Sequence, residues 1–249
     1  MTEQSERTEP RRAELAAALS HTRARIDAAC RAAGRDPGEV RLLAVTKTFP
    51  VSDAALLCDL GVLDLAENRE QEAARKAVEL PELRPRVAVR WHMVGRLQRN
   101  KARSVVRWAA EVQSVDSPRL AEALARAVAA AVAAGERSGP LDVLLQASID
   151  GDPARGGCPL DELDALADAV TRSGDLRLRG TMAVAPREMH PGAAFERLAA
   201  AAERLRRDHP GATELSAGMT GDLEAAITHG STCVRVGTAL LGTRALASP

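Results

Sequence analysis

The chain has 249 residues and a formal net charge of zero, because 34 acidic side chains balance 34 basic ones. This length suits one large α/β domain or two small ones. The balanced charge excludes a global basic field for nucleic acid or for an anionic membrane, so we expect a small-molecule partner.

The first part of the chain precedes the repeating pattern. Residues 1–11 are polar and lack a signal-peptide core, and we expect them to form a disordered lead-in. Residues 12–34 carry Leu, Ile and Ala at roughly helical spacing, which predicts one amphipathic helix that stops at Gly34. No apolar run approaches membrane-spanning length. The four cysteines are far apart and form no CxxC pair, which fits a reduced, cytoplasmic protein.

Short runs rich in Leu and β-branched residues then alternate with helical stretches rich in Ala, Glu and Arg. This alternation predicts parallel strands joined by helices. Eight such units are typical of a (β/α)8 TIM-type barrel, with a doubly wound sheet as the alternative, and we assign residues 12–249 to a single barrel domain. The predicted strands are residues 40–47, 63–68, 89–95, 111–116, 141–148, 176–184, 212–218 and 233–238.

Polar side chains lie at or near the carboxyl ends of seven of the predicted strands. In a barrel these ends converge on one mouth, where catalytic and binding groups collect, and this placement favours the barrel over the doubly wound sheet. The residues are Lys47, Asn68, His92, Asp116, Ser148, Ser216 and Thr238.

Lys47 ends an apolar run in a chain whose 34 basic residues include only three lysines, at positions 47, 76 and 101. Unlike a guanidinium, an amine can lose its proton and attack a carbonyl. Lys47 is therefore a candidate for Schiff-base chemistry. The alternative is a lysine whose stem covers apolar surface while its ammonium reaches water.

Two glycine-bearing turns follow the last two predicted strands. The first, Ser216 to Asp222, opens a helix at Leu223, and the second, Arg235 to Thr238, closes the last strand. Amides at a helix start bind anions, and barrels commonly hold phosphate in the loops after strands seven and eight. Barrel closure brings these loops beside strand one, as pyridoxal phosphate requires for its phosphate and its aldehyde. Arg235 then falls near the ring and its nitrogen, unless it pairs with a carboxylate.

Seven motifs together resemble the pyridoxal phosphate homeostasis protein family, whose fold is like the N-terminal barrel domain of alanine racemase. They are AVTKTFP, AENREQE, WHMVGRLQRNK, QSVD, RGTMAV, LSAGMTGDLEAAITHGST and VRVGTALLG, from about Val40 to Arg244. The resemblance implies that Lys47 carries the cofactor as a Schiff base and that Arg235 faces the pyridine nitrogen. It also implies that Asn68 lies beside the ring and that the phosphate is held by Ser216, Thr220, Gly237 and Thr238.

Two weaker candidates remain outside these motif roles. The basic residues Arg96, Arg99, Lys101 and Arg103 form either a solvated helix face or a second anion contact at the mouth. His92 suits a structural strand position better than an acid or base. The histidines share no spacing with cysteines or carboxylates, so the sequence indicates no metal site.

The resemblance implies a protein of intracellular pyridoxal phosphate homeostasis, which stores, buffers or delivers the cofactor to apoenzymes without defined turnover. We expect it to be monomeric or weakly associating. The chain has no tyrosine to act as the opposite-face base of alanine racemases, and we expect no covering domain after Arg244. Two alternatives remain. One is a pyridoxal phosphate-dependent racemase, decarboxylase or lyase, and the other is a cofactor-free aldolase whose Lys47 reacts with a sugar phosphate.

Overall fold

A computed structural model of the chain describes residues 3–243, with side chains for residues 8–152 and 154–243. All eight predicted strands are present, each within its predicted range. They are β1 (Arg41–Val45), β2 (Asp64–Glu67), β3 (Arg90–Met93), β4 (Glu111–Val115), β5 (Leu141–Ser148), β7 (Leu176–Met182), β8 (Glu214–Ser216) and β9 (Cys233–Val236).

The strands form a closed parallel barrel, which confirms the predicted fold class. Neighbouring strands pair in the order β4-β3-β2-β1-β9-β8-β7-β5, and the pairing of β4 with β5 closes the sheet. Register runs from Arg41 opposite Cys233 to Ala44 opposite Val236, so β1 lies directly beside β9. The first and last strands of the barrel are therefore neighbours, as the cofactor hypothesis requires.

A short ninth strand, β6 (Cys158–Pro159), pairs with the end of β5 outside the barrel. Two residues carry no periodicity, so the sequence did not indicate it.

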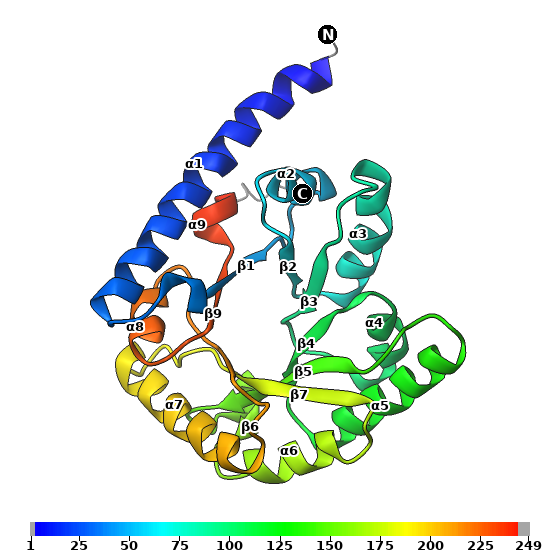
Figure 1. Cartoon of the computed structure of the whole chain (residues 1–249), viewed down its shortest axis with the longest axis vertical. Coiled ribbons are helices and arrows are strands. Elements are labelled where there is room, and N and C mark those ends of the chain that lie inside the picture. Colours follow the sequence, from blue (N-terminus) through cyan, green and yellow to red (C-terminus); the bar gives the residue numbers. More distant parts are fainter. Residues whose placement is uncertain (1–2, 244–249) are drawn as a thin grey trace.

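Helices surround the barrel, one before the first strand and the others after the strands (Figure 1). They are α1 (Glu3–Ala32), α2 (Val51–Asp59), α3 (Glu70–Leu83), α4 (Ala102–Trp108), α5 (Pro118–Ala133), α6 (Leu163–Thr171), α7 (Pro191–Asp208), α8 (Leu223–Thr228) and α9 (Thr238–Leu241), with 3-10 turns at Pro37–Glu39, Arg99–Lys101 and Pro153–Arg155. None of the helices in the described part of the chain is long and apolar enough to cross a bilayer.

Helix α1 begins at Glu3 rather than near residue 12, where the apolar spacing starts, and it continues through Pro10. Residues 3–9 contain no apolar side chain, so periodicity could not indicate a helix there. Downstream, Leu15, Leu19 and Ile26 are buried where α1 packs against α8 and α9. The helix ends as predicted, because Gly34 adopts a φ of 66°.

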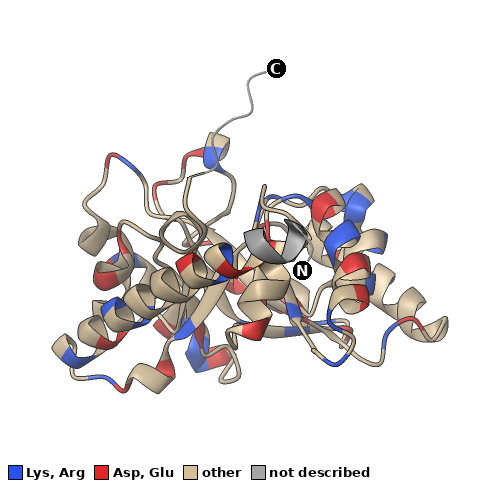
Figure 2. Ribbon diagram, turned by 90° about the horizontal axis from the view of Figure 1, so that it is seen from above, with Lys and Arg blue, Asp and Glu red and all other residues tan. Residues whose placement is uncertain are grey.

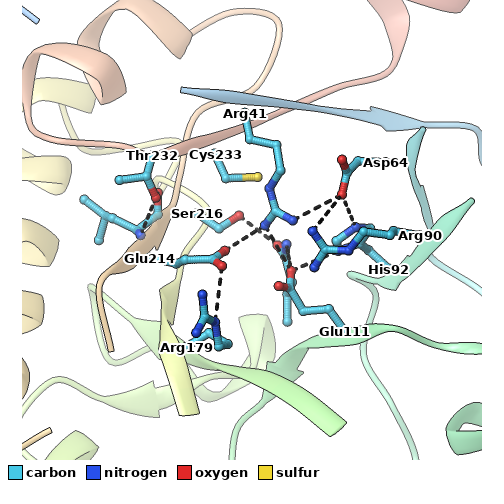
Figure 3. A network of polar contacts seen from close by, with 12 residues as sticks. Arg41, Asp64, Arg90, His92, Glu111, Arg179, Glu214, Ser216, Thr232 and Cys233 are labelled. Atoms are coloured by element: carbon cyan, nitrogen blue, oxygen red, sulfur yellow. Dashed lines mark hydrogen bonds and ion pairs between the residues drawn. The ribbon is translucent and has the colours of Figure 1, made fainter. Parts of the chain in front are cut away.

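The apolar core lies between the barrel and its helices, whereas part of the barrel interior is polar (Figure 3). Successive side chains along a strand point to opposite faces of the sheet. Arg41 on β1 and Glu111 on β4 belong to the face that points into the barrel. Arg41 donates to Glu214 at 2.7 Å and to Glu111 at 3.3 Å. His92 has no exposed surface and lies between Glu111 at 2.9 Å and Asp64 at 2.8 Å. These ion pairs join strands across the interior.

Candidate cofactor site

A cavity of about 900 Å³ opens at the carboxyl ends of the strands. The loops that follow β1, β2, β8 and β9 contribute to its wall, and β7 supplies apolar surface. Six of the seven residues predicted for the cofactor line it, namely Lys47, Asn68, Thr220, Arg235, Gly237 and Thr238. The barrel therefore brings together positions from both ends of the sequence.

Lys47 lies two residues beyond the end of β1, with an exposed side chain on the cavity wall. Among the described residues, its Nζ has no hydrogen-bond or ion-pair partner. The preceding Thr46 is buried and bonded, so the chain leaves the barrel in a defined direction before Lys47. An unpaired primary amine at this wall is available for a carbonyl ligand.

Asn68 follows β2 directly and is half-buried at the cavity. Its backbone packs against Gly95, where an added Cβ would meet the Asn68 carbonyl carbon at 2.7 Å. Only glycine permits this approach, so the loop after β3 supports the loop that carries Asn68.

The turns after β8 and β9 form the opposite wall. Within the described chain, the amide groups of Thr220, Gly221 and Gly237 donate to no backbone or side-chain acceptor. Gly218 has a φ of 91° and packs so closely that a Cβ would lie 2.7 Å from that of Ala226. The glycine thus shapes a turn whose free amides and threonine hydroxyl suit an anion.

Arg235 lies at the floor of the cavity and is only 5% exposed. Its Nη1 donates to Ser216 Oγ and its Nη2 to the carbonyl oxygen of Ala183, both at 2.7 Å. Burial lowers the pKa of Arg235 from its usual value. No described carboxylate forms an ion pair with it, so the alternative of a carboxylate-paired arginine does not hold. A buried cation with neutral partners can donate toward a ligand in the cavity.

Ser216 is the one predicted site residue that does not line the cavity. Its side chain is fully buried and lies between two partners, since Ser216 Oγ donates to Gln113 Oε1 at 2.7 Å and accepts from Arg235. The alternation of β8 turns this side chain into the barrel interior, below the turn that contains Thr220. Ser216 therefore contacts Arg235, and the resemblance had implied a phosphate contact.

The other polar strand residues lie outside the cavity. His92 is buried in the ion-pair network, which is the structural role expected of it. Arg96, Arg99 and Arg103 are exposed, and Lys101 lies 3.6 Å from Glu70. No cluster of three or more His, Cys, Asp or Glu side chains suited to a metal occurs in the described part of the chain.

Sequence reasoning missed the apolar part of the cavity wall and Gln113, the hydrogen-bond partner of Ser216. Strand-end apolar residues carry no chemical signal of their own, and Gln113 is far from Ser216 in sequence. The missed cavity residues include Phe49, Val94, Met182, Val184 and Met219.

These residues fit pyridoxal phosphate in each of its chemical parts. An unpaired amine suits its aldehyde, free amides and a hydroxyl suit its phosphate, and apolar side chains with a buried guanidinium suit its heteroaromatic ring. The volume of about 900 Å³ lies within the range of pockets that hold small-molecule ligands.

Comparison with known proteins agrees with this fit. The alanine racemase N-terminal domain model matches residues 18–245. The pyridoxal phosphate homeostasis protein of Mycobacterium leprae is 47% identical over 247 residues, which cover 96% of each chain. A protein from Bifidobacterium adolescentis described as unknown has a TM-score of 0.85 at 32% identity, over 93% of this chain and 96% of that one. PipY of Synechococcus elongatus with PLP bound has a TM-score of 0.78 at 31% identity, over 92% of this chain and 100% of that one.

Proposed function

The chain belongs to the alanine racemase N-terminal domain family and, within it, to the pyridoxal phosphate homeostasis proteins, and from this we propose that it holds the cofactor as a Schiff base on Lys47. The protein then stores, buffers or delivers pyridoxal phosphate inside the cell, with apoenzymes that need it as recipients. The observation that carries the proposal is the single cavity that joins Lys47, Arg235 and the turns after β8 and β9.

Each wall of the cavity has its own role. Lys47 supplies the amine that binds the aldehyde, and Asn68 flanks the ring. Thr220, Gly237 and Thr238 bind the phosphate through amides and hydroxyls, since charge-assisted hydrogen bonds are the stronger ones. Arg235 donates to the pyridine nitrogen, and Ser216 supports Arg235 from below.

Arg235 is also the reason to propose a carrier rather than a catalyst. Bound pyridoxal phosphate supplies an electron sink, which is strongest when its ring nitrogen is protonated. A guanidinium can only donate, so it keeps that nitrogen as an acceptor and weakens the sink. In addition, the sequence contains no tyrosine that could move a proton on the face opposite Lys47.

Reduction with borohydride, followed by peptide mass spectrometry, tests the proposed attachment. We expect the wild-type protein to be yellow with cofactor and to carry the reduced adduct on Lys47. The Lys47→Ala variant should lose both the colour and the adduct. A main adduct on Lys76 or Lys101 would contradict the assignment, and a colourless wild-type protein that forms an adduct with a sugar phosphate would favour the aldolase.

Exchange of amino-acid α-hydrogens with deuterated solvent separates carrier from enzyme. We expect the loaded protein to exchange them at a rate barely above that of free pyridoxal phosphate. Rapid exchange that disappears in Lys47→Ala would identify a racemase, decarboxylase or lyase.

A further inference from the structure

Lys76 on α3 is buried outside the cavity, with 1% of its surface exposed. Its Nζ donates to Glu67 Oε1 at 2.7 Å, to the carbonyl oxygen of Thr46 at 2.8 Å and to Glu72 Oε1 at 2.9 Å. These three acceptors use every N–H group of one ammonium. The planar fork of arginine spreads its donors apart, which explains a lysine here in a chain that otherwise prefers arginine.

The two carboxylates of this cluster, defined as Lys76, Glu67 and Glu72, also hold the residues on both sides of Lys47. Thr46 Oγ1 donates to Glu67 Oε1 at 2.5 Å. The Thr48 amide donates to Glu72 Oε1 at 2.7 Å. Together with the bond from Lys76 to the Thr46 carbonyl, the cluster ties down the backbone immediately before and after Lys47.

The backbone at Thr48 requires such support. Thr48 has a φ of 68° and is the only non-glycine residue with a positive φ in the described part of the chain. A β-branched residue rarely adopts this left-handed conformation, which persists only where surrounding contacts enforce it. Because Lys47 Nζ has no described partner of its own, the flanking backbone sets the direction of the side chain.

Burial makes the cluster depend on its cation. Glu67 has no exposed surface, and its Oε2 has no described hydrogen-bond partner. Burial raises the pKa of Glu67, and the hydrogen bonds from Lys76 and Thr46 oppose that rise. Removal of Lys76 would leave this carboxyl group buried beside Glu72 without a counter-charge, so both groups would rearrange and release the loop.

We propose that Lys76 is a positioning residue for Lys47: through Glu67 and Glu72 it holds the Thr46–Thr48 backbone so that the Lys47 amine meets the ligand carbonyl. This inference rests on the proposed function, in which Lys47 is the attachment site. Lys76 touches no ligand itself, and its effect reaches the cavity only through the loop.

Two measurements on Lys76→Met test the proposal. Hydrogen exchange of cofactor-free protein reports the loop directly, and we expect the Thr48 amide to exchange at least about tenfold faster than in wild type. Stopped-flow absorbance with pyridoxal phosphate reports the amine, and we expect loading of Lys47 to slow by about tenfold or more, because a misplaced nucleophile loses near-attack geometry. Both measurements are made well below the melting temperature of the variant.

Arg137→Met is the matched control for lost stability. Arg137 lies in the loop before β5, at the opposite end of the barrel. It donates to the carbonyl oxygens of Val106 and Ala109, both at 2.9 Å. This variant should have a lower melting temperature than wild type. Its Thr48 amide should exchange hydrogen, and its Lys47 should load pyridoxal phosphate, at wild-type rates. If Lys76→Met does not fold, Glu72→Ala removes the acceptor of the Thr48 amide at a partly exposed site, whereas Glu72→Gln keeps an oxygen there and should load faster than Glu72→Ala.

The outcomes also separate this inference from the proposed function. Wild-type loading rates in folded Lys76→Met, or equal slowing in Arg137→Met, would overturn the positioning role while Lys47 remained the attachment site. Failure of the wild-type protein to form the Lys47 adduct would overturn the proposed function, and the exchange of the Thr48 amide would still decide whether Lys76 holds the loop.

Discussion

Arg235 and Ser216 have different positions at the floor of the cavity. Arg235 faces the cavity, whereas Ser216 is buried below it and joins Arg235 to Gln113. Gln113 Nε2 in turn donates to Glu111 Oε1 at 2.7 Å, so the chain of contacts reaches the ion pairs of the barrel interior. The orientation of Arg235 is thus set from inside the barrel.

We expect Ser216→Ala to lower the free energy of unfolding by about 1–3 kcal/mol, because Gln113 Oε1 and one Arg235 N–H lose a buried partner. Urea unfolding of the cofactor-free protein measures this loss. Affinity for pyridoxal and for pyridoxal phosphate should fall together, since the serine acts through Arg235. Full stability with a selective loss of pyridoxal phosphate binding would restore the serine to the phosphate site.

Thr220→Val provides the contrasting variant at the cavity wall. Among the described residues, its Oγ1 accepts only a long hydrogen bond of 3.3 Å from the Ala239 amide, so its removal should affect stability little. Loss of the hydroxyl that we propose to bind the phosphate should weaken the binding of pyridoxal phosphate and leave the binding of pyridoxal unchanged. Titration with both compounds compares the two affinities.

At the scale of elements, the strands of the barrel are held together by charge. Arg41 on β1 reaches carboxylates on β2, β4 and β8, and His92 on β3 joins two of the same carboxylates (Figure 3). Burial alone would raise the pKa of Glu111, but the hydrogen bond from His92 and the charges of His92 and Arg41 lower it to about 2. The ionised carboxylate is therefore preferred in the folded barrel.

This preference predicts how stability depends on pH. The pKa of Glu111 is about 2 in the folded protein against a usual 4.5, so its contribution is complete above about pH 4.5 and declines as the pH falls toward 2. Glu111→Gln should lose on the order of 3 kcal/mol near neutral pH, and this difference from wild type should shrink with acidification. Urea unfolding from pH 7 to pH 3 measures it, with exposed Glu82→Gln as the control. A pH-independent difference would contradict the argument.

The contact between the loops after β2 and β3 predicts a second effect at this scale. Gly95→Ala forces a Cβ against the Asn68 backbone, so the two loops must separate, and we expect a loss of about 1–3 kcal/mol in the free energy of unfolding. Cofactor affinity should fall as well because Asn68 moves. Gly211→Ala is the matched control, since nothing lies within 4 Å of its added Cβ. Equal effects of the two substitutions would contradict the role of the Gly95 contact.

At the scale of the whole molecule, charge and apolar surface are both dispersed. Basic and acidic residues are interspersed over the barrel rather than separated onto two faces (Figure 2). Large exposed apolar side chains lie on several different elements. They are Leu63, Val78, Leu83, Val132, Val184 and Met219. Stable interfaces need a contiguous patch with an apolar centre, and this scatter does not favour one.

We therefore expect the protein to be a monomer in solution. Light scattering coupled to size exclusion should give a mass near 26.3 kDa, with and without bound cofactor. A mass about twice this value at micromolar concentration would show that two copies share an interface despite the dispersed surface.

The sequence alone determined the strands, the barrel and six residues of the cavity wall that bear polar side chains or glycine. Alternation of apolar strand and helix is a local property, and the carboxyl ends of parallel strands meet whatever the details of packing, so Lys47, Asn68 and Gly237 could be assigned from position. The motifs then indicated pyridoxal phosphate as the cofactor, with a cofactor-free aldolase as an alternative.

Only the tertiary structure decided which side chains face one another across the barrel. Ser216 and Gln113 are 103 residues apart, and their contact depends on strand register and inward direction. Likewise, the sequence distinguished Lys47 by its place at a strand end but gave no role to Lys76. Packing encloses Lys76 with acceptors from two separate segments, whereas Lys47 has no partner among the described residues at the cavity wall. Spacing along the chain fixes the element and face of a residue, while its partners depend on how distant elements pack.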